Sequence, residues 1–187
     1  MRVAIIPARG GSRRIPRKNI RHFFGMPIMA RSILTAEQTN MFHHIFVSTD
    51  DEEIAEVAKR YGASVIVRGP SLSVDEVGTQ EVMRHAILSL PKAADEACCI
   101  YATAPLLTPA DLIQGWGALR GQGMPYAFVP GLYYWGHGYA FAERVPLHEG
   151  FDVPFPQERY VDINDESDWQ KAEEMYRRVM ARHGEAR

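Results

Sequence analysis

The sequence predicts an α/β fold, with one domain built around a mainly parallel β-sheet. Short apolar runs rich in β-branched residues, typical of buried strands, lie at residues 3–6, 44–49, 63–67 and 97–102. Amphipathic stretches separate these runs, and strands that alternate with helices at this spacing form βαβ units. With 187 residues, 46% of them hydrophobic, the chain can bury one substantial core, so we expect a single domain over residues 1–187.

The segments between these strands carry helix signals. Pro27 is placed to start a helix after the first strand and its loop. A cap and acids at residues 50–53 open the next helix, which Gly62 ends. Because acids at a helix start are an ordinary capping device, we assign these acids no catalytic role. Further helices are expected from residue 80 to about residue 90 and from Pro109 onward.

The C-terminal third is less regular. An aromatic cluster at residues 133–141 could form one wall of a ligand site, but aromatic residues at strand spacing are more often packed in a core, and we favour a core strand with its turn. Residues 160–162 are expected to be a strand end, followed by a capped helix. Asp162 precedes that turn, where its carboxylate can point toward the rim of the sheet.

The first strand leads into a strongly basic loop. The loop contains no acidic residue, and its cations are Arg9, Arg13, Arg14, Arg17, Lys18 and Arg21. Adjacent glycines at positions 10 and 11 let the backbone approach a ligand and expose N–H donors, and arginine matches the geometry of phosphate. Paired glycines usually mark only a turn, and a basic loop can also be merely solvated or bind nucleic acid. Pro7 and Pro16 stiffen the loop, which favours a preformed site for a polyphosphate.

Charge and composition limit the other classes of function. The net charge is −2, from 21 basic and 23 acidic residues, whereas a protein that binds duplex nucleic acid normally has a broad basic surface. No apolar run is long enough for a signal peptide or a membrane span, so we expect a cytoplasmic protein without a membrane or nucleic-acid partner. Cys98 and Cys99 are adjacent, lack the spacing of a zinc or redox site, and are expected to be buried free thiols.

The basic loop also carries a family resemblance. Residues 5–20 read Ile-Ile-Pro-Ala-Arg-Gly-Gly-Ser-Arg-Arg-Ile-Pro-Arg-Lys-Asn-Ile, followed by Val-Ser-Thr-Asp at 47–50, Arg-Gly-Pro at 68–70 and Tyr-Ala-Thr-Ala-Pro-Leu at 101–106. This pattern is similar to the acylneuraminate cytidylyltransferases, which activate nine-carbon 2-keto sugar acids. The basic residue at Arg14 and the tyrosine at Tyr101 resemble the pseudaminic-acid branch, since sialic-type relatives usually have glutamine at the latter position. The resemblance implies a three-layer, Rossmann-like nucleotide-sugar transferase fold.

The resemblance also implies a reaction and its residues. CTP and a 2-keto-3-deoxy sugar acid, of the pseudaminic or sialic type, would give the CMP-sugar and pyrophosphate. Catalytic roles fall on Arg9, Lys18 and Asp162. Nucleotide contacts fall on Ala8, Gly10, Gly11, Ser12, Asn19, Arg68, Thr79 and Tyr101.

The same resemblance implies a Mg²⁺ cofactor. The family has an Asp-Ile-Asp whose two carboxylates hold the metal, and this chain has Asp162-Ile163-Asn164. Magnesium takes one or two carboxylates together with phosphate oxygens and water. Asn164 offers a carbonyl oxygen without charge, so we expect metal affinity to be weaker than in the usual family member.

A second departure lies between about residues 129 and 132, where the family's long excursion, with sugar contacts and much of the dimer interface, is missing. We therefore expect the nucleotide half of the site to be intact and the sugar half to be abbreviated. A homodimer is possible, but without the excursion it would be weakened. The alternative function is a nucleotide-binding protein of the same fold with lost or altered transferase activity.

Overall fold

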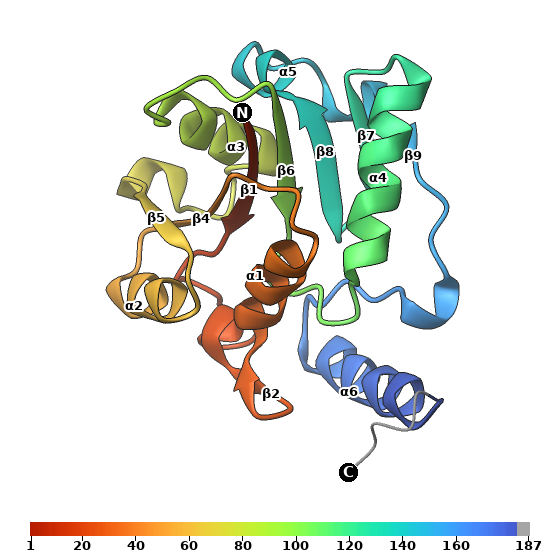
Figure 1. Ribbon diagram of the computed structural model, residues 1–187. Coiled ribbons are helices and arrows are strands. Elements are labelled where there is room, and N and C mark those ends of the chain that lie inside the picture. Colours follow the sequence, from red (N-terminus) through yellow and green to blue (C-terminus); the bar gives the residue numbers. More distant parts are fainter. Residues whose placement is uncertain (183–187) are drawn as a thin grey trace.

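The computed structural model describes residues 1–182 and contains a seven-stranded sheet in the order β5-β4-β1-β6-β8-β7-β9 (Figure 1). β1, β4, β5 and β6 are parallel, β8 is antiparallel to both β6 and β7, and β9 is parallel to β7. The predicted mainly parallel sheet is therefore confirmed. The strands are β1 (Arg2–Pro7), β4 (His44–Thr49), β5 (Ser64–Val67), β6 (Glu96–Ile100), β7 (Tyr126–Val129), β8 (Tyr133–His137) and β9 (Phe151–Asp152).

Helices cover both faces of the sheet and make three layers, as predicted (Figure 1). Alternate residues of β1 point to opposite faces, and its four central residues are buried: Ala4 and Ile6 pack on one side, Val3 and Ile5 on the other. Helices α1, α2 and α4 lie on the first side, and α3 and α5 on the second. Their bounds are α1 (Ile28–Gln38), α2 (Glu52–Arg60), α3 (Thr79–Leu88), α4 (Pro109–Gln122) and α5 (Gly138–Ala142).

A third apolar cluster lies beyond the carboxyl end of β1. It joins Ile15 of the basic loop and Phe23 of the short β2–β3 hairpin (His22–Phe23 and Met26–Pro27) to Trp169 of α6 (Glu166–Arg182). Figure 1 shows α6 and the hairpin together below the sheet. Because the cluster contains residues from both ends of the chain, it brings the basic loop against the segment that carries Asp162. The remaining short elements are the 3-10 turns η1 (Lys18–Ile20), η2 (Pro70–Leu72), η3 (Leu147–Glu149) and η4 (Gln157–Arg159).

Several local predictions are confirmed. Asp51 caps α2, since its carboxylate accepts a hydrogen bond from the backbone N of Ile54 at 2.9 Å. Cys98 and Cys99 are free, buried and on opposite faces of β6, and burial raises the pKa of both thiols. The core interpretation of the aromatic cluster is also right for β8, whose Tyr133 and Trp135 are fully buried.

The predicted strand end at residues 160–162 is wrong. This segment is extended but pairs with no strand, and it leads from η4 directly into α6. Its residues still alternate as in a strand, because Val161 and Ile163 pack into the third cluster while Asp162 and Asn164 face outward. Side-chain packing, rather than a β-ladder, therefore sets the direction of Asp162.

Two further observations concern the outer parts of the fold. Residues 130–132 join β7 directly to β8, with a left-handed backbone at Gly131 (φ 72°). Within residues 1–182, no helix combines the length and the hydropathy needed to cross a bilayer.

Candidate active site

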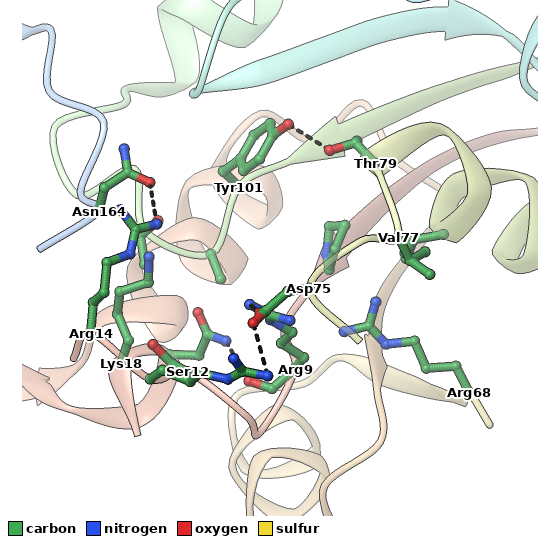
Figure 2. Close-up of a pocket in the computed structure, with 16 residues that line it drawn as sticks. Arg9, Ser12, Arg14, Lys18, Arg68, Asp75, Val77, Thr79, Tyr101 and Asn164 are labelled. Carbon is green, nitrogen blue, oxygen red and sulfur yellow. Dashed lines mark hydrogen bonds and ion pairs between the residues drawn. The ribbon is translucent and has the colours of Figure 1, made fainter. Parts of the chain in front are cut away.

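A pocket of about 460 Å³ lies at the carboxyl ends of β1, β5 and β6, the edge at which parallel sheets usually bind ligands (Figure 2). The basic loop forms one side of it, Arg68 and the loop before α3 form another, and the residues that follow β6 form its base. The lining residues are Pro7, Arg9, Ser12, Arg13, Arg14, Lys18, Asn19, Arg68, Asp75, Val77, Thr79, Val82, Tyr101, Ala102, Thr103 and Asn164.

The pocket is strongly positive. Five lining side chains are cationic, and among the lining residues that the structure describes Asp75 is the only acid. The carboxylate of Asp75 pairs with Arg9 and lies 3.2 Å from Nη2 of Arg13. The hydrogen bond from Arg9 lowers the pKa of Asp75. One carboxylate against five cations leaves a net positive cavity, which fits a ligand with several negative charges.

Lys18 is a partly buried cation at the inner end of the loop. Its Nζ donates a hydrogen bond to the backbone O of Ile163 at 2.6 Å. Burial lowers the pKa of Lys18, Asp162 opposes this effect, and the neighbouring Arg14 and Arg9 lower it further. Because no carboxylate within residues 1–182 forms an ion pair with Lys18, its charge is available to an incoming anion.

Arg68 follows β5 and is only 5% exposed. Its Nε atom is buried and has no hydrogen-bond partner among the described residues, and burial lowers the pKa of the guanidinium. Figure 2 shows the side chain pointing into the pocket. Since an unpaired buried donor costs free energy, a bound acceptor at this position would be stabilised.

Neutral lining residues form two hydrogen bonds at the pocket. Asn19 Nδ2 donates to the backbone O of Arg9 at 2.9 Å and so closes the basic loop on itself. The hydroxyls of Thr79 and Tyr101 are 2.7 Å apart, and burial raises the pKa of Tyr101 (Figure 2). The first bond lies within the basic loop, the second joins α3 to the residue after β6, and together they give the pocket a preformed polar wall.

Not every residue expected at the site lines the pocket. Ala8 is buried in the core, and neither Gly10 nor Gly11 is a lining residue. The backbone N–H of Gly10 donates to Oδ1 of Asp50 at 3.0 Å. This N–H is therefore bonded to a side chain of the protein. The prediction that Gly10 contacts the nucleotide did not include this bond.

Two cations of the basic loop also point elsewhere. Arg17 pairs with Asp51 and Glu53, and Arg21 pairs with Glu166. The interpretation of the whole basic run as one anion-binding set is thus wrong for these two arginines. The acids that follow β4 were predicted only to start a helix, but they also pair with the basic loop. Their position after β4, at the same edge of the sheet as the loop, could have indicated this second contact.

Asp162 and Asn164, the expected metal ligands, have different surroundings. Asn164 lines the pocket, and its Oδ1 accepts from Arg14 Nη2 at 3.3 Å. Asp162 is outside the lining set, and its carboxyl group packs against Gly131, where an added Cβ would lie 2.9 Å from Cγ. Over residues 1–182, no group of three or more histidine, cysteine or acidic side chains is placed to hold a metal ion.

Comparisons with known proteins agree with the fold and with the motif. A family model described as cytidylyltransferase matches residues 3–133, well over half of the chain. A pseudaminic acid cytidylyltransferase from Campylobacter jejuni is 47% identical over 118 residues, which cover 61% of this chain and 51% of the relative. N-acylneuraminate cytidylyltransferase A from Danio rerio is 38% identical over 125 residues, 67% of this chain and 29% of the relative. The chain thus spans about half the length, or less, of these curated relatives.

Solved structures share the fold at low sequence identity. The structure of CMP:2-keto-3-deoxy-manno-octonic acid synthetase complexed with CTP superposes with a TM-score of 0.73 at 15% identity and covers 97% of this chain and 99% of its own. A cytidylyltransferase from Leptospira borgpetersenii superposes with a TM-score of 0.70 at 15% identity and covers 99% of this chain and 95% of its own. On the strength of the family match over residues 3–133, this chain belongs to the cytidylyltransferase family.

Proposed function

We propose that the protein transfers a cytidylyl group from CTP to a nine-carbon 2-keto-3-deoxy sugar acid of the pseudaminic or sialic type. The observation that carries the proposal is the set of five cations around a 460 Å³ pocket at the ligand-binding edge of a cytidylyltransferase fold. The similarity to the Campylobacter jejuni pseudaminic acid cytidylyltransferase supports the pseudaminic type. CTP and the sugar acid are the partners that this reaction needs.

The chemistry follows from the charges. The anomeric hydroxyl of the sugar acid attacks the α-phosphorus and gives its proton to water. A new P–O bond forms, the bond between the α-phosphorus and the oxygen that bridges it to the β-phosphate breaks, and pyrophosphate leaves with the electron pair. Negative charge grows on the bridging oxygen as that bond breaks. Arg9 and Lys18 supply fixed positive charge from the basic loop, and fixed charge requires no reorganisation when negative charge appears. Arg68, Ser12, Asn19, Thr79 and Tyr101 hold and orient the nucleotide in this proposal.

Magnesium fits the site as a partner of the nucleotide. Asp162 offers a carboxylate just outside the pocket lining, and Asn164 offers its amide oxygen, which now accepts a hydrogen bond from Arg14. Both come from outward positions of one extended segment, and oxygen donors are those that Mg²⁺ prefers. Two donors do not complete its coordination, so phosphate oxygens and water would supply the rest. When bound, magnesium would neutralise phosphate charge and hold the leaving group in place. The magnesium cofactor, the cytoplasmic location and a homodimer stay predictions.

Replacing Asn164 by aspartate tests the metal assignment. We expect the variant to bind Mg²⁺ about tenfold more tightly in the presence of CTP, because a second carboxylate adds charge to the donor set. The measurement is the Mg²⁺ concentration at half-maximal thermal stabilisation of the CTP-saturated protein, which does not depend on turnover. Asn164→Ala is the matched control and should need more Mg²⁺ than the native protein. Identical Mg²⁺ midpoints in all three proteins would remove residue 164 from the metal site.

The proposed reaction is tested by product analysis. The protein is incubated with CTP, Mg²⁺ and a panel of pseudaminic, legionaminic and sialic acids, and pyrophosphate and CMP-sugar are measured. We expect stoichiometric formation of both products with at least one acid. If CTP binds but no acid in the panel gives pyrophosphate, the result would instead support the alternative, a nucleotide-binding protein of this fold that has lost the transferase activity.

A further inference from the structure

Both ends of the basic loop are attached to the start of α2. At the beginning of the loop, the backbone N–H of Gly10 donates to Oδ1 of Asp50 at 3.0 Å. At its end, the guanidinium of Arg17 binds both carboxylate oxygens of Asp51, with Nη1–Oδ2 and Nη2–Oδ1 distances of 2.5 and 3.0 Å. Arg17 also pairs with Glu53 in the first turn of α2. Two consecutive acids thus hold the two ends of one loop.

The backbone at Arg17 is adapted to this attachment. Arg17 has φ 55° and ψ 28°, a left-handed conformation that residues other than glycine rarely adopt. It is followed at once by Lys18, which lines the pocket, whereas Arg17 does not. Because such conformations persist only where the surrounding contacts impose them, the contact with Asp51 is a physical reason for the turn that directs Lys18 inward.

The carboxylate of Asp51 also restricts which side chain can stand at the start of the loop. A Cβ added at Gly10 would lie 2.4 Å from Oδ2 of Asp51, so the loop backbone packs directly on Asp51. Each attachment point is adjacent in sequence to a cation of the pocket: Gly10 follows Arg9, and Arg17 precedes Lys18. The hydrogen bond from Asn19 to the backbone O of Arg9 joins the two sides of the loop.

We propose that Arg17 is a positioning residue that, through its two-pronged contact with Asp51, fixes the placement of Lys18 relative to Arg9 at the phosphate-binding edge of the pocket. The inference rests on the proposed function for the identity of the ligand. The pair is partly exposed, with exposed side-chain fractions of 39% for Arg17 and 20% for Asp51. Ion pairs of this kind contribute little to global stability, so the effect of the contact should be on geometry rather than on folding.

The test replaces Arg17 by methionine, which keeps an unbranched but shorter side chain and the same backbone demand, and removes the ion pair. Since a misplacement of about 1 Å can cost on the order of 100-fold in rate, we expect kcat for CTP and pseudaminic acid to fall by about 10–100-fold. KM for CTP should rise by less than about fivefold, because developing charge is more sensitive to placement than ground-state binding. Arg17→Lys, which restores the charge but not the fork, should recover part of kcat.

Two measurements separate positioning from loss of structure. The melting temperature of Arg17→Met should stay within about 3 °C of the native value, as for other exposed ion pairs. Amide hydrogen exchange over residues 9–19 should accelerate in this variant and not in Lys59→Met, which removes an exposed ion pair to Glu56 on the same helix.

The possible failures are distinguishable. A native protein that releases no pyrophosphate would overturn the proposed function, and the exchange experiment would still show whether Arg17 holds the loop. Native kcat and native exchange in Arg17→Met would overturn the positioning role. A fall of more than 5 °C in melting temperature, with no recovery of kcat in Arg17→Lys, would assign Arg17 a structural role and also overturn the inference.

Discussion

Replacing Lys18 by alanine is expected to lower kcat by about 10²–10³-fold while the protein stays folded. Its Nζ enters the pocket beside Arg14 and Arg9 and donates a hydrogen bond to the backbone O of Ile163 at 2.6 Å. Removing one preorganised donor that stabilises developing negative charge typically costs this much in turnover. The measurement is steady-state release of pyrophosphate from CTP with saturating pseudaminic acid. The matched control is Lys59→Met, which removes a lysine on the outside of α2 and should keep the native rate.

A second replacement, Lys18→Met, tests the effect of this lysine on the pH dependence of stability. Burial lowers the pKa of Lys18 below its ordinary value of 10.5, so the folded state disfavours the charged form relative to the unfolded state. The charged lysine therefore costs stability at neutral pH, and this cost disappears as the pH rises through the lowered pKa toward 10.5. We expect the native protein to gain stability relative to Lys18→Met as the pH rises toward 10.5, as measured by chemical denaturation. A native rate in Lys18→Ala, or a stability difference that does not change with pH, would contradict these assignments.

The sequence was sufficient for what depends on neighbouring residues. The apolar run of β1, the cap at Asp51 and the turn at Gly62 all act within a few positions, and their effects are strong. The composition of the basic loop also predicted a polyanion site at the edge of a parallel sheet, and five cations line a pocket there.

What the sequence could not predict depends on contacts between distant segments. The direction of Arg17 follows from Asp51, 34 positions away, and no local pattern distinguishes it from Arg14, which does line the pocket. The segment at 160–162, with its one acid Asp162, suggested a strand end, yet it is extended because Val161 and Ile163 pack against α6 and the β2–β3 hairpin. Apolar residues at every second position show that one side of an extended segment is buried. They do not show that the segment pairs with another strand.

The ion pair between Asp111 and Arg159 anchors the segment before Asp162, and breaking it is the second change expected to have a large effect. Asp111, in the first turn of α4, accepts two parallel hydrogen bonds from Arg159, with Oδ2–Nη1 and Oδ1–Nη2 distances of 2.6 and 2.8 Å. Asp111 is 5% exposed and also accepts from the backbone N of Thr108 at 2.8 Å, which closes the capping box of α4. Arg159 reaches further to the backbone O of Leu106 at 3.2 Å. The pair therefore ties the start of α4 to the chain just before Asp162.

Replacing Asp111 by alanine is expected to lower the free energy of unfolding by about 3 kcal/mol. Breaking a buried pair costs about 3–5 kcal/mol because it leaves an uncompensated charge, and the partial exposure of Arg159, 19% for its side chain, puts this pair at the lower end. At this chain length we expect the melting temperature to fall by about 6–12 °C. The double variant Asp111→Ala/Arg159→Met should recover part of the loss, since it removes the unpaired cation as well.

The pH dependence of stability provides the independent check on Asp111. Burial alone would raise its pKa, but the hydrogen bonds from Arg159 and Thr108 outweigh burial and lower it below the ordinary value of 3.8. A carboxylate whose pKa falls on folding contributes stability above its unfolded pKa and loses that contribution as the pH falls through the folded value. The stability difference between the native protein and Asp111→Ala should thus be constant from about pH 5 to pH 8 and shrink below about pH 4. A difference that stays constant down to pH 2, or one below about 1 kcal/mol at pH 7, would mean that the Asp111–Arg159 pair does not anchor the segment that carries Asp162.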